Sequence, residues 1–381
     1  MKTLRHLSYL TNTLPARFNV LGIESSFDDS AVGILDSHGN IYAHVECSQL
    51  LHHLPTGGVN PVIASGLHKQ NLPPLLDQCF DRSGLTPKDI HVVAYTKGPG
   101  LGVSLLHGAN LAVNFFRENL SPPRLLIGIH HMLAHALVPR ISNRIAFPYL
   151  TLLASGGHCL LCIVQELGIS EVIRLGSTLD TAPGNVLDHG ARLLQLSRYP
   201  EFSECSGGQA IERISLRGTL RHPVLNILPR DRNANFSFSG LGSSLEYKLN
   251  SIAKQRIVSY QDKADLALWF QTSLIRHITT KTQNGIRFCR IHFPQINSLV
   301  VSGGVAQNLA FQKAVTELCR QHNYTAVYPA LELCTDNAVM IAWAGVEYAN
   351  AGIGIESPED EVHFIPRWKL GEDWTMKLTQ N

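Results

Sequence analysis

Apolar, β-prone residues form two similar paired runs along the chain. Val20–Leu35 contains two such runs around a polar, acid-rich turn, and Tyr149–Val164 repeats the plan around Ser155-Gly-Gly-His158. Each pattern predicts a β-hairpin. Because each hairpin opens one half of the chain, the sequence predicts two similar lobes that arose by duplication. In such a pair we expect the ligand to lie between the lobes, with both hairpin tips facing it.

Helical periodicity follows each predicted hairpin. It is clearest at Asn71–Arg82, 103–118 and Asp262–Phe288. A last apolar stretch predicts a further helix, capped by Thr335 or Asp336. The order of hairpin, strand and helix in each half predicts an α/β protein with two lobes.

Three glycine turns follow predicted strands: Gly98-Pro-Gly-Leu-Gly102, Ser155-Gly-Gly157 and Ser302-Gly-Gly304. Adjacent glycines let backbone amides approach a phosphate closely, and a strand, glycine loop and helix N-terminus together can hold an anion. Ordinary hairpin and βα turns use the same residues. Three such turns in one chain favour nucleotide binding.

The composition of the chain excludes several classes of protein. The chain has 381 residues, of which 44% are hydrophobic and 16% charged, which is typical of a globular protein with room for two domains. The net charge of +2 excludes a strongly basic nucleic-acid binder, so an RNA substrate would need a local basic patch. Eight scattered cysteines indicate reduced thiols. The apolar run 338–346 is too short to cross a membrane, and we expect no membrane insertion.

The N-terminus has the composition of a targeting segment. Residues 1–23 contain no acid, whereas Lys2, Arg5 and Arg17 are basic, and Ser and Thr recur. This composition is typical of a mitochondrial transit peptide, which we place at residues 1–19. An ordinary frayed terminus is the alternative interpretation.

The motif His130-His-Met-Leu-Ala-His135 is the sharpest chemical signal. On a helix, His131 and His135 project from nearly the same side and can share one metal ion. Position 132 is Met, where a zinc peptidase of this pattern needs Glu as its base, so peptidase chemistry is disfavoured. Two polar histidines on a helix without a metal remain the alternative.

Two imidazoles need at least one further anionic ligand for a divalent ion. Asp336, at a predicted helix start in the other half of the chain, is the candidate, although N-capping alone would also explain it. Such a set leaves open positions for substrate oxygens. Asp180 and Asp188 could bind ribose hydroxyls or act as a base, and His158 could assist proton removal.

Taken together, the motifs resemble the tRNA threonylcarbamoyladenosine transferase family, known in bacteria as TsaD. The resemblance covers about residues 20–352, and two stretches, 155–161 and 177–184, look most like the animal mitochondrial branch. The matching motifs are Leu21-Gly-Ile-Glu-Ser-Ser, Gly57-Gly-Val-Asn-Pro61, Gly98-Pro-Gly-Leu101, His130-His-Met-Leu-Ala-His135, Ser155-Gly-Gly-His158, Phe236-Ser-Phe-Ser-Gly-Leu241, Ser302-Gly-Gly304 with Asn308, and Cys334-Thr-Asp-Asn337.

The resemblance implies an actin-like, sugar-kinase-like (ASKHA) fold of two lobes, with the active site in the cleft between them. We place the N-terminal lobe at 20–147, the C-terminal lobe at 148–352 and a tail at 353–381. It implies His131, His135 and Asp336 as ligands of one divalent metal ion, which could be Fe, Zn or Mg. It further implies substrate contacts from Leu153, Ala154, Ser155, Gly156, Gly157, Asp188, Gly208 and Asn308.

The implied reaction transfers the threonylcarbamoyl group from threonylcarbamoyl-AMP to N(6) of the adenosine 3′ of the anticodon. Its substrates would be mitochondrial tRNAs that read codons starting with A. The resemblance also implies a separate synthase that supplies the donor, a homodimer and a location in the mitochondrial matrix. The alternatives are an ATP-dependent small-molecule kinase or carbamoyltransferase, a metallopeptidase, and a non-catalytic nucleotide-binding scaffold.

Some positions depart from the bacterial pattern. Val62 and Gly66 stand where many members have Glu and Arg, and Phe27 replaces a common Cys. Asn185 and His189 replace Glu and Lys around Asp188, and Ala338 stands where Gly is usual. None of these changes removes an implied metal ligand, so they concern substrate positioning.

Overall fold

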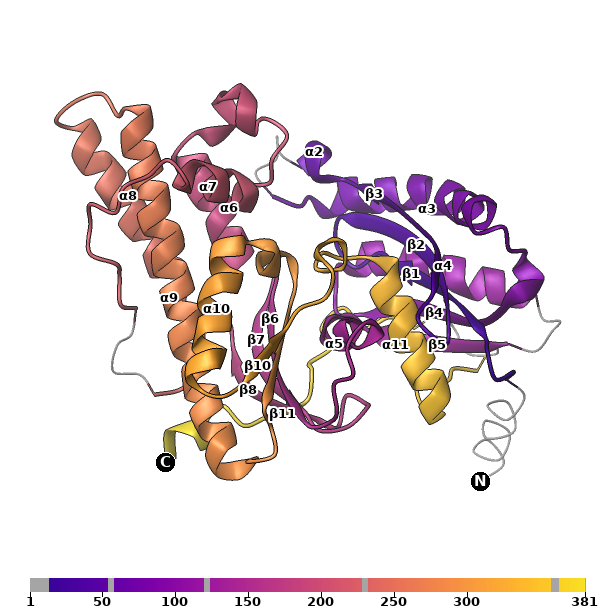
Figure 1. Ribbon diagram of the computed structural model, residues 1–381. Coiled ribbons are helices and arrows are strands. Elements are labelled where there is room, and N and C mark those ends of the chain that lie inside the picture. Colours follow the sequence, from indigo (N-terminus) through magenta and orange to yellow (C-terminus); the bar gives the residue numbers. More distant parts are fainter. Residues whose placement is uncertain (1–13, 54–57, 120–123, 228–231, 358–362, 381) are drawn as a thin grey trace. The chain divides into compact units, whose positions relative to one another are not determined.

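The computed structural model describes residues 14–53, 58–119, 124–227, 232–357 and 363–380 (Figure 1). Most of the predicted transit peptide, residues 1–13, lies outside this part of the chain. The described residues form two compact units. The first unit comprises those up to Arg144, a short insert at Leu167–Glu171, and Asp336–Gly371. The second unit comprises Ile145–Glu166, Val172–Thr335 and the residues from Glu372 onward.

The first unit contains a five-stranded sheet in the order β3-β2-β1-β4-β5. Strands β1, β2 and β3 are antiparallel neighbours, whereas β4 and β5 run parallel to β1. The predicted first hairpin is confirmed as β1 and β2. The strands are β1 (Asn19–Glu24), β2 (Asp29–Asp36), β3 (Ile41–Ser48), β4 (Ile90–Gly98) and β5 (Leu125–His130).

Alternating residues of β1 send side chains to opposite faces of this sheet. Leu21 and Ile23 belong to the core beneath α3 and α4, whereas Gly22 lies against the backbone of α11. The helices of this unit are α2 (Leu50–His53), α3 (Pro61–Ser83), α4 (Gly102–Glu118), α5 (His131–Leu137) and α11 (Ala338–Ala351), with short 3₁₀ turns at η2 (Pro87–Asp89) and η3 (Val138–Ile141).

Helix α3 begins ten residues before the predicted start at Asn71. Asn60 caps it by accepting hydrogen bonds from the amides of Val62 and Ile63, and Pro61 occupies the first helical position, where no amide proton is needed. The prediction was wrong because it began the helix at the clearest apolar periodicity and overlooked this cap.

The second unit contains a six-stranded sheet in the order β10-β9-β6-β7-β8-β11. The second predicted hairpin is confirmed as β6 and β7. The strands are β6 (Tyr149–Ala154), β7 (Cys159–Val164), β8 (Val172–Ser177), β9 (Ser298–Ser302), β10 (Thr325–Val327) and β11 (Glu372–Asp373).

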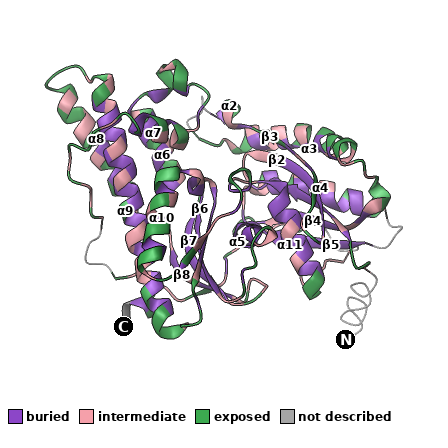
Figure 2. Cartoon of the chain, in the orientation of Figure 1, coloured by how far each residue is buried: buried purple, intermediate pink, exposed green. Residues whose placement is uncertain are grey.

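A 33-residue helix, α9, organises the second unit, because α7, α8 and α10 all pack against it. Figure 2 shows buried positions along its length. The remaining helical elements are α6 (Pro183–Leu193), α7 (Gly207–Ser215), α8 (Ser239–Ala253), α9 (Tyr260–His292), α10 (Leu309–Gln321), η4 (Leu196–Arg198), η5 (Pro200–Phe202), η6 (Gly304–Gln307), η7 (Leu331–Leu333) and η8 (Lys377–Gln380).

The two sheets share one connectivity. In each sheet a central strand, β1 or β6, pairs antiparallel with the next strand of its hairpin, which pairs antiparallel with a third. On the other side the central strand pairs parallel with β4 or β9, which pairs parallel with β5 or β10. This agreement supports the duplication that the two hairpins predicted.

The units differ from the lobes expected at 20–147 and 148–352 in the placement of α11. This helix packs on the first sheet, because small residues on both sides allow close approach: Gly22 meets Ala338 and Ala342, and Gly345 meets Ala94. The structured chain also begins before residue 20, since Phe18 is buried and Arg17 pairs with Asp36.

The expected C-terminal tail at 353–381 is shared between the units. Its first part contacts two strands of the first sheet: the amide of Glu356 donates to the carbonyl of Leu126, and the amide of Ile365 donates to the carbonyl of Lys97. Its second part adds β11 to the edge of the second sheet beside β8. Within the described residues, no helix is both long and apolar enough to cross a membrane.

Candidate metal centre and nucleotide loops

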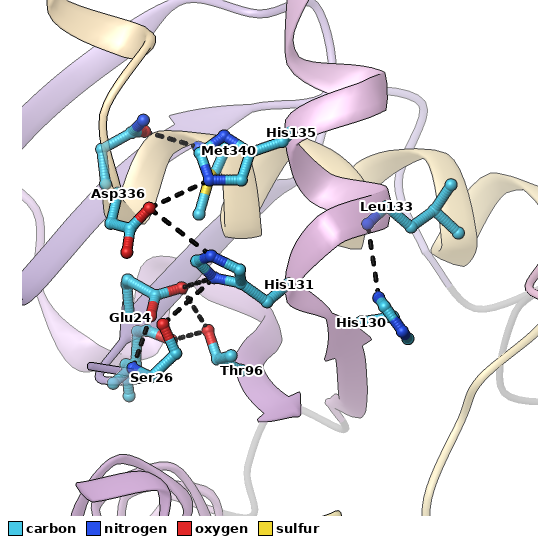
Figure 3. A network of polar contacts seen from close by, with 11 residues as sticks. Glu24, Ser26, Thr96, His130, His131, Leu133, His135, Asp336 and Met340 are labelled. Carbon is cyan, nitrogen blue, oxygen red and sulfur yellow. Dashed lines mark hydrogen bonds and ion pairs between the residues drawn. The ribbon is translucent and has the colours of Figure 1, made fainter. Parts of the chain in front are cut away.

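Three side chains that the sequence singled out for metal binding converge in the first unit. Figure 3 shows His131 and His135 on successive turns of α5, both facing Asp336 just before α11. One oxygen of Asp336, Oδ1, lies 3.0 Å from Nε2 of His135 and 3.4 Å from Nε2 of His131. Both histidines are buried, whereas the side chain of Asp336 is 20% exposed. Asp336 is thus the member of the cluster that solvent reaches.

Local sequence explains how the two elements present these groups. His130 ends β5 and caps α5, its Nδ1 accepting from the amide of Leu133, so His131 and His135 fall on one face of the helix. Asn337, and neither Thr335 nor Asp336 as predicted, caps α11 by accepting from the amide of Met340 at 2.8 Å. Asp336 is therefore free of capping and turns toward the histidines.

Neighbouring opposite charges shift the pKa values of the cluster strongly. Burial disfavours a charged His131, but Asp336 and Glu24 on either side outweigh it and raise the pKa of His131 to about 10. Burial would raise the pKa of Asp336, yet the two histidines hold that pKa far below its usual range. In the absence of a metal, a proton on His131 therefore neutralises part of the acidic charge.

The donor set suits a divalent transition metal. Ligand atoms about 2.0–2.2 Å from one ion lie roughly 3.0–3.5 Å apart at ordinary coordination angles, and the two separations from Asp336 Oδ1 match this range. The three candidate ligand atoms all lie within 4.8 Å of one another. Two imidazoles and one carboxylate favour iron or zinc over magnesium, which prefers oxygen ligands.

Sequence reasoning missed the residues behind His131. Its Nδ1 lies 3.1 Å from Oε2 of Glu24 and 3.2 Å from Oγ of Ser26 (Figure 3). Thr96 in turn donates to the same carboxylate at 2.6 Å. The signal was present, because Glu24 is the first acid of the chain and directly follows Val20–Ile23, a run of apolar residues and one glycine.

The second unit places an open glycine turn at the end of β6, where Leu153 and Ala154 lead into it. The turn is closed by the amide of Ser155 donating to the carbonyl of His158, and by the amide of His158 donating to Ser155 Oγ. Gly156 and Gly157 are exposed, and a Cβ on either would meet nothing within 4 Å. Their amides have no partner among the described residues, as an anion site requires.

The second glycine turn of this unit lies beside the first. Gly303 has φ +102°, and a Cβ there would stand 2.3 Å from the carbonyl oxygen of Ala154, so only glycine fits. Asn308, expected to contact the adenylate, caps α10 by accepting from Phe311 and donates to Gln271. These two hydrogen bonds hold the side chain of Asn308 in place, and the residue is only 8% exposed.

Asp188 on α6 faces the start of α7. Its carboxylate accepts hydrogen bonds from the amides of Gly207 and Gly208, and although burial is the larger effect and raises its pKa, these amides and Arg192 oppose the rise. A Cβ on Gly207 would lie 2.4 Å from Asp188 Oδ1, which explains glycine at that position. The expected substrate residues Asp188 and Gly208 are thus brought together.

Asp180 is held in a way that does not suit a base. Its carboxylate accepts from the hydroxyls of Ser237 and Ser239 at 2.6 Å and from the amides of Thr181, Phe238 and Ser239. Burial opposes these bonds, but together they hold the pKa of Asp180 well below its usual range. The structure therefore gives Asp180 the task of anchoring the Phe236–Ser239 segment.

The Gly98–Gly102 loop does not form the anion cradle that its sequence suggested. The amide of Gly100 donates to the carbonyl of Pro366, and that of Leu101 donates to Ser26. A Cβ on Gly98 would lie 2.0 Å from the carbonyl oxygen of Ile365. The glycines allow backbone to pack on backbone, and two of the amides that a phosphate would need are already used.

Known proteins are similar to this chain in sequence. A profile of the family described as tRNA N6-adenosine threonylcarbamoyltransferase (TsaD) matches residues 40–343. Mitochondrial proteins of that name from Homo sapiens and Mus musculus are 39% and 38% identical, covering 97% and 99% of this chain and 90% and 92% of their own length. The Rhizobium meliloti protein of that name is 37% identical, covering 93% of this chain and 96% of its own.

Solved structures agree on the fold. HypF from T. kodakarensis matches with a TM-score of 0.55 at 15% identity, over 89% of this chain and 49% of its own. A component of (R)-2-hydroxyglutaryl-CoA dehydratase from Acidaminococcus fermentans matches with a TM-score of 0.51 at 14% identity, over 87% of this chain and 99% of its own. Two mixed sheets with helices in this arrangement define the two-lobed ASKHA class of α/β proteins. Within that class, the chain belongs to the tRNA N6-adenosine threonylcarbamoyltransferase family, whose members are transferases.

Proposed function

We propose that this protein transfers the threonylcarbamoyl group from threonylcarbamoyl-AMP to N(6) of the adenosine 3′ of the anticodon. Its substrates are mitochondrial tRNAs that read codons starting with A. The observation that carries the proposal is the His131, His135 and Asp336 cluster in a member of this family. The open turn at Gly156 and Gly157 supports it, because the second unit there offers free amides to the donor's phosphate.

His131, His135 and Asp336 would hold one divalent ion, which we expect to be iron or zinc from the donor set. A bound divalent ion supplies Lewis acidity, which stabilises negative charge on phosphate or carbonyl oxygens. Position 132 is a buried Met, so the chain lacks the Glu that follows the first histidine ligand and acts as the base in a zinc peptidase of this pattern. This arrangement favours acyl transfer over the metallopeptidase alternative.

The protein's own groups would act mainly by holding the donor. The amides of Gly156 and Gly157 would bind its phosphate, and Asp188 and Asn308 would lie beside the nucleoside as rigid, hydrogen-bonded groups. AMP is a good leaving group, so placing the weakly nucleophilic adenine amine against the acyl carbon accounts for most of the remaining barrier.

We expect direct transfer without an acyl-enzyme. Cys334, two positions before Asp336 in the sequence, is buried, and burial raises the pKa of its thiol to about 11. Burial also raises the pKa of Cys159, next to the glycine turn, well above its usual value. Neither thiol is therefore available as a thiolate nucleophile near neutral pH.

The relatives named as mitochondrial support a location in the mitochondrial matrix. We propose that residues 1–19 direct the chain there, that a separate synthase supplies threonylcarbamoyl-AMP, and that the enzyme works as a homodimer. The only RNA substrate class we propose is tRNA, the substrate in the names of its relatives.

The experiment uses purified protein, unmodified tRNA transcript and a synthase that generates threonylcarbamoyl-AMP. Mass spectrometry of the digested nucleosides should detect threonylcarbamoyladenosine with the wild type and lose it with Asp336→Asn. Asp36→Asn is the matched control, since Asp36 is also a buried, hydrogen-bonded carboxylate of the first unit but makes no contact with the cluster. No product from folded, metal-loaded wild type would refute the proposed reaction.

A further inference from the structure

Glu24 is a carboxylate buried completely at the end of β1, on the side of His131 that faces away from Asp336 (Figure 3). Its Oε2 lies 3.1 Å from Nδ1 of His131, whereas Asp336 lies next to Nε2 of the same ring. Glu24 is not one of the three candidate metal ligands. It contacts the metal site through one imidazole ring.

The surroundings of Glu24 fix which atom donates to which. The amide of Ser26 donates to Oε1 at 2.6 Å, and the hydroxyl of Thr96 donates to Oε2 at 2.6 Å. An ionised carboxylate has no proton to give, so Nδ1 of His131 must be the donor in its contact with Glu24. When the ring is neutral, as a metal ligand must be, it therefore carries its proton on Nδ1 and its lone pair on Nε2, the atom beside Asp336.

We propose that Glu24 is a positioning residue that fixes the ring orientation and the Nδ1–H tautomer of His131, so that Nε2 is ready to bind the metal. The inference rests on the metal site of the proposed function. A carboxylate behind a ligand histidine also makes the imidazole a stronger electron donor. The carboxylate adds negative charge near the ion without occupying a coordination position.

The burial of Glu24 indicates that this residue serves the metal site and not the stability of the fold. Moving a carboxylate from water into the protein interior costs free energy, whereas burying an apolar side chain does not. The neighbouring residues of β1 from Val20 to Ile23 are apolar or glycine. Glu24 ends this run, and its side chain contacts His131. Ser26 and Thr96 supply one donor to each oxygen of the carboxylate and so hold it beside Nδ1 of His131.

The test measures metal binding to the full chain. Metal-free wild type, Glu24→Gln and the control Asp36→Asn are titrated with Zn²⁺ against a chromophoric chelator, and with Co²⁺, whose visible absorption reports ligand geometry. We expect Glu24→Gln to bind both ions about 10-fold to 100-fold more weakly and to change the Co²⁺ spectrum. Asp36→Asn should stay within about threefold of wild type, because Asp36 lies outside the network.

A second readout follows the ring itself. With ¹⁵N-labelled histidine, the wild type loaded with Zn²⁺ should show His131 as the Nδ1–H tautomer, identified by the signal missing from His131→Ala. If Glu24→Gln does not fold, Thr96→Val decides, because it removes only one donor to the carboxylate and should weaken binding about twofold to tenfold.

Wild-type affinity and an unchanged Co²⁺ spectrum in folded Glu24→Gln would overturn the inference while leaving the metal site intact. If the wild type itself binds neither ion more tightly than His135→Ala does, the metal site of the proposed function fails, and the role of Glu24 fails with it. Loss of tRNA modification with normal metal binding in Glu24→Gln would also overturn the positioning role.

Discussion

Gly22→Ala tests the contact that joins the metal site to the first sheet. A Cβ on Gly22 would stand 2.3 Å from the carbonyl oxygen of Ala338, 2.7 Å from the amide nitrogen of Ala342 and 2.8 Å from its Cβ. Two of these three atoms belong to the backbone of α11. A side chain could rotate away, but a helix backbone can only move as a whole.

The size of the effect follows from these distances. Ordinary contacts begin near 3.4 Å, so relief requires α11 to move by about 1 Å, and overpacking of this kind costs about 1–3 kcal/mol. Replacing glycine in a strand returns about 0.5–1 kcal/mol of chain entropy. We expect a net loss of about 1 kcal/mol in the free energy of unfolding. Asp336, two residues before α11, would leave the roughly 0.5 Å tolerance of a preorganised site.

Urea unfolding followed by circular dichroism measures the first effect, and chelator competition with Zn²⁺ measures the second. Gly66→Ala is the matched control, because Gly66 is exposed within α3 and a Cβ there meets nothing within 4 Å. The free energy of unfolding of that variant should rise by about 0.5–1 kcal/mol. If Gly22→Ala unfolds at the wild-type urea concentration and binds Zn²⁺ normally, the tight packing of α11 on β1 is not what positions Asp336.

Two further predictions concern the second unit. Asp180→Ala should lose about 1–2 kcal/mol in urea unfolding at pH 7, because charge-assisted hydrogen bonds are broken at a partly exposed site. Because the pKa of Asp180 is lowered in the folded state, this difference in stability should persist above about pH 4 and shrink only as the pH falls further. A difference that stays constant down to about pH 3 would show that the ionised carboxylate is not its cause. Gly207→Ala should displace Asp188, lower the free energy of unfolding by about 1–3 kcal/mol and weaken the binding of AMP measured by calorimetry. Gly208→Ala, whose Cβ would meet only Leu187 at 3.7 Å, should retain wild-type stability, and equal losses in both variants would argue against the Asp188 contact.

Local patterns in the sequence were enough for part of the fold and site. Both hairpins, the helix after Gly102 and the spacing of His131 and His135 depend on residues a few positions apart, and the structure has them all. Asp336 was found by a chemical requirement, the need for an anionic ligand. Its approach to the histidines depends on tertiary packing of α11.

Other features depended on partners far away in the chain. The Gly98–Gly102 loop looked like a phosphate cradle because its sequence does not reveal that Pro366, more than 260 positions later, accepts one of its amides. Glu24 was overlooked because its importance comes from His131, on another element of the first unit. The helix cap at Asn60 was a local signal, and it was available without the structure.

The division of the first unit between both ends of the chain bears on its biosynthesis. When β5 has left the ribosome, all five strands of the first sheet exist, but α11, which covers Gly22, is still about 220 residues from completion, or roughly 10–45 s at ordinary translation rates. During that interval one apolar face of the sheet has no helix over it, and His131 and His135 have no Asp336. The nascent chain therefore offers a chaperone a defined surface, and the metal site can close only when translation is nearly over.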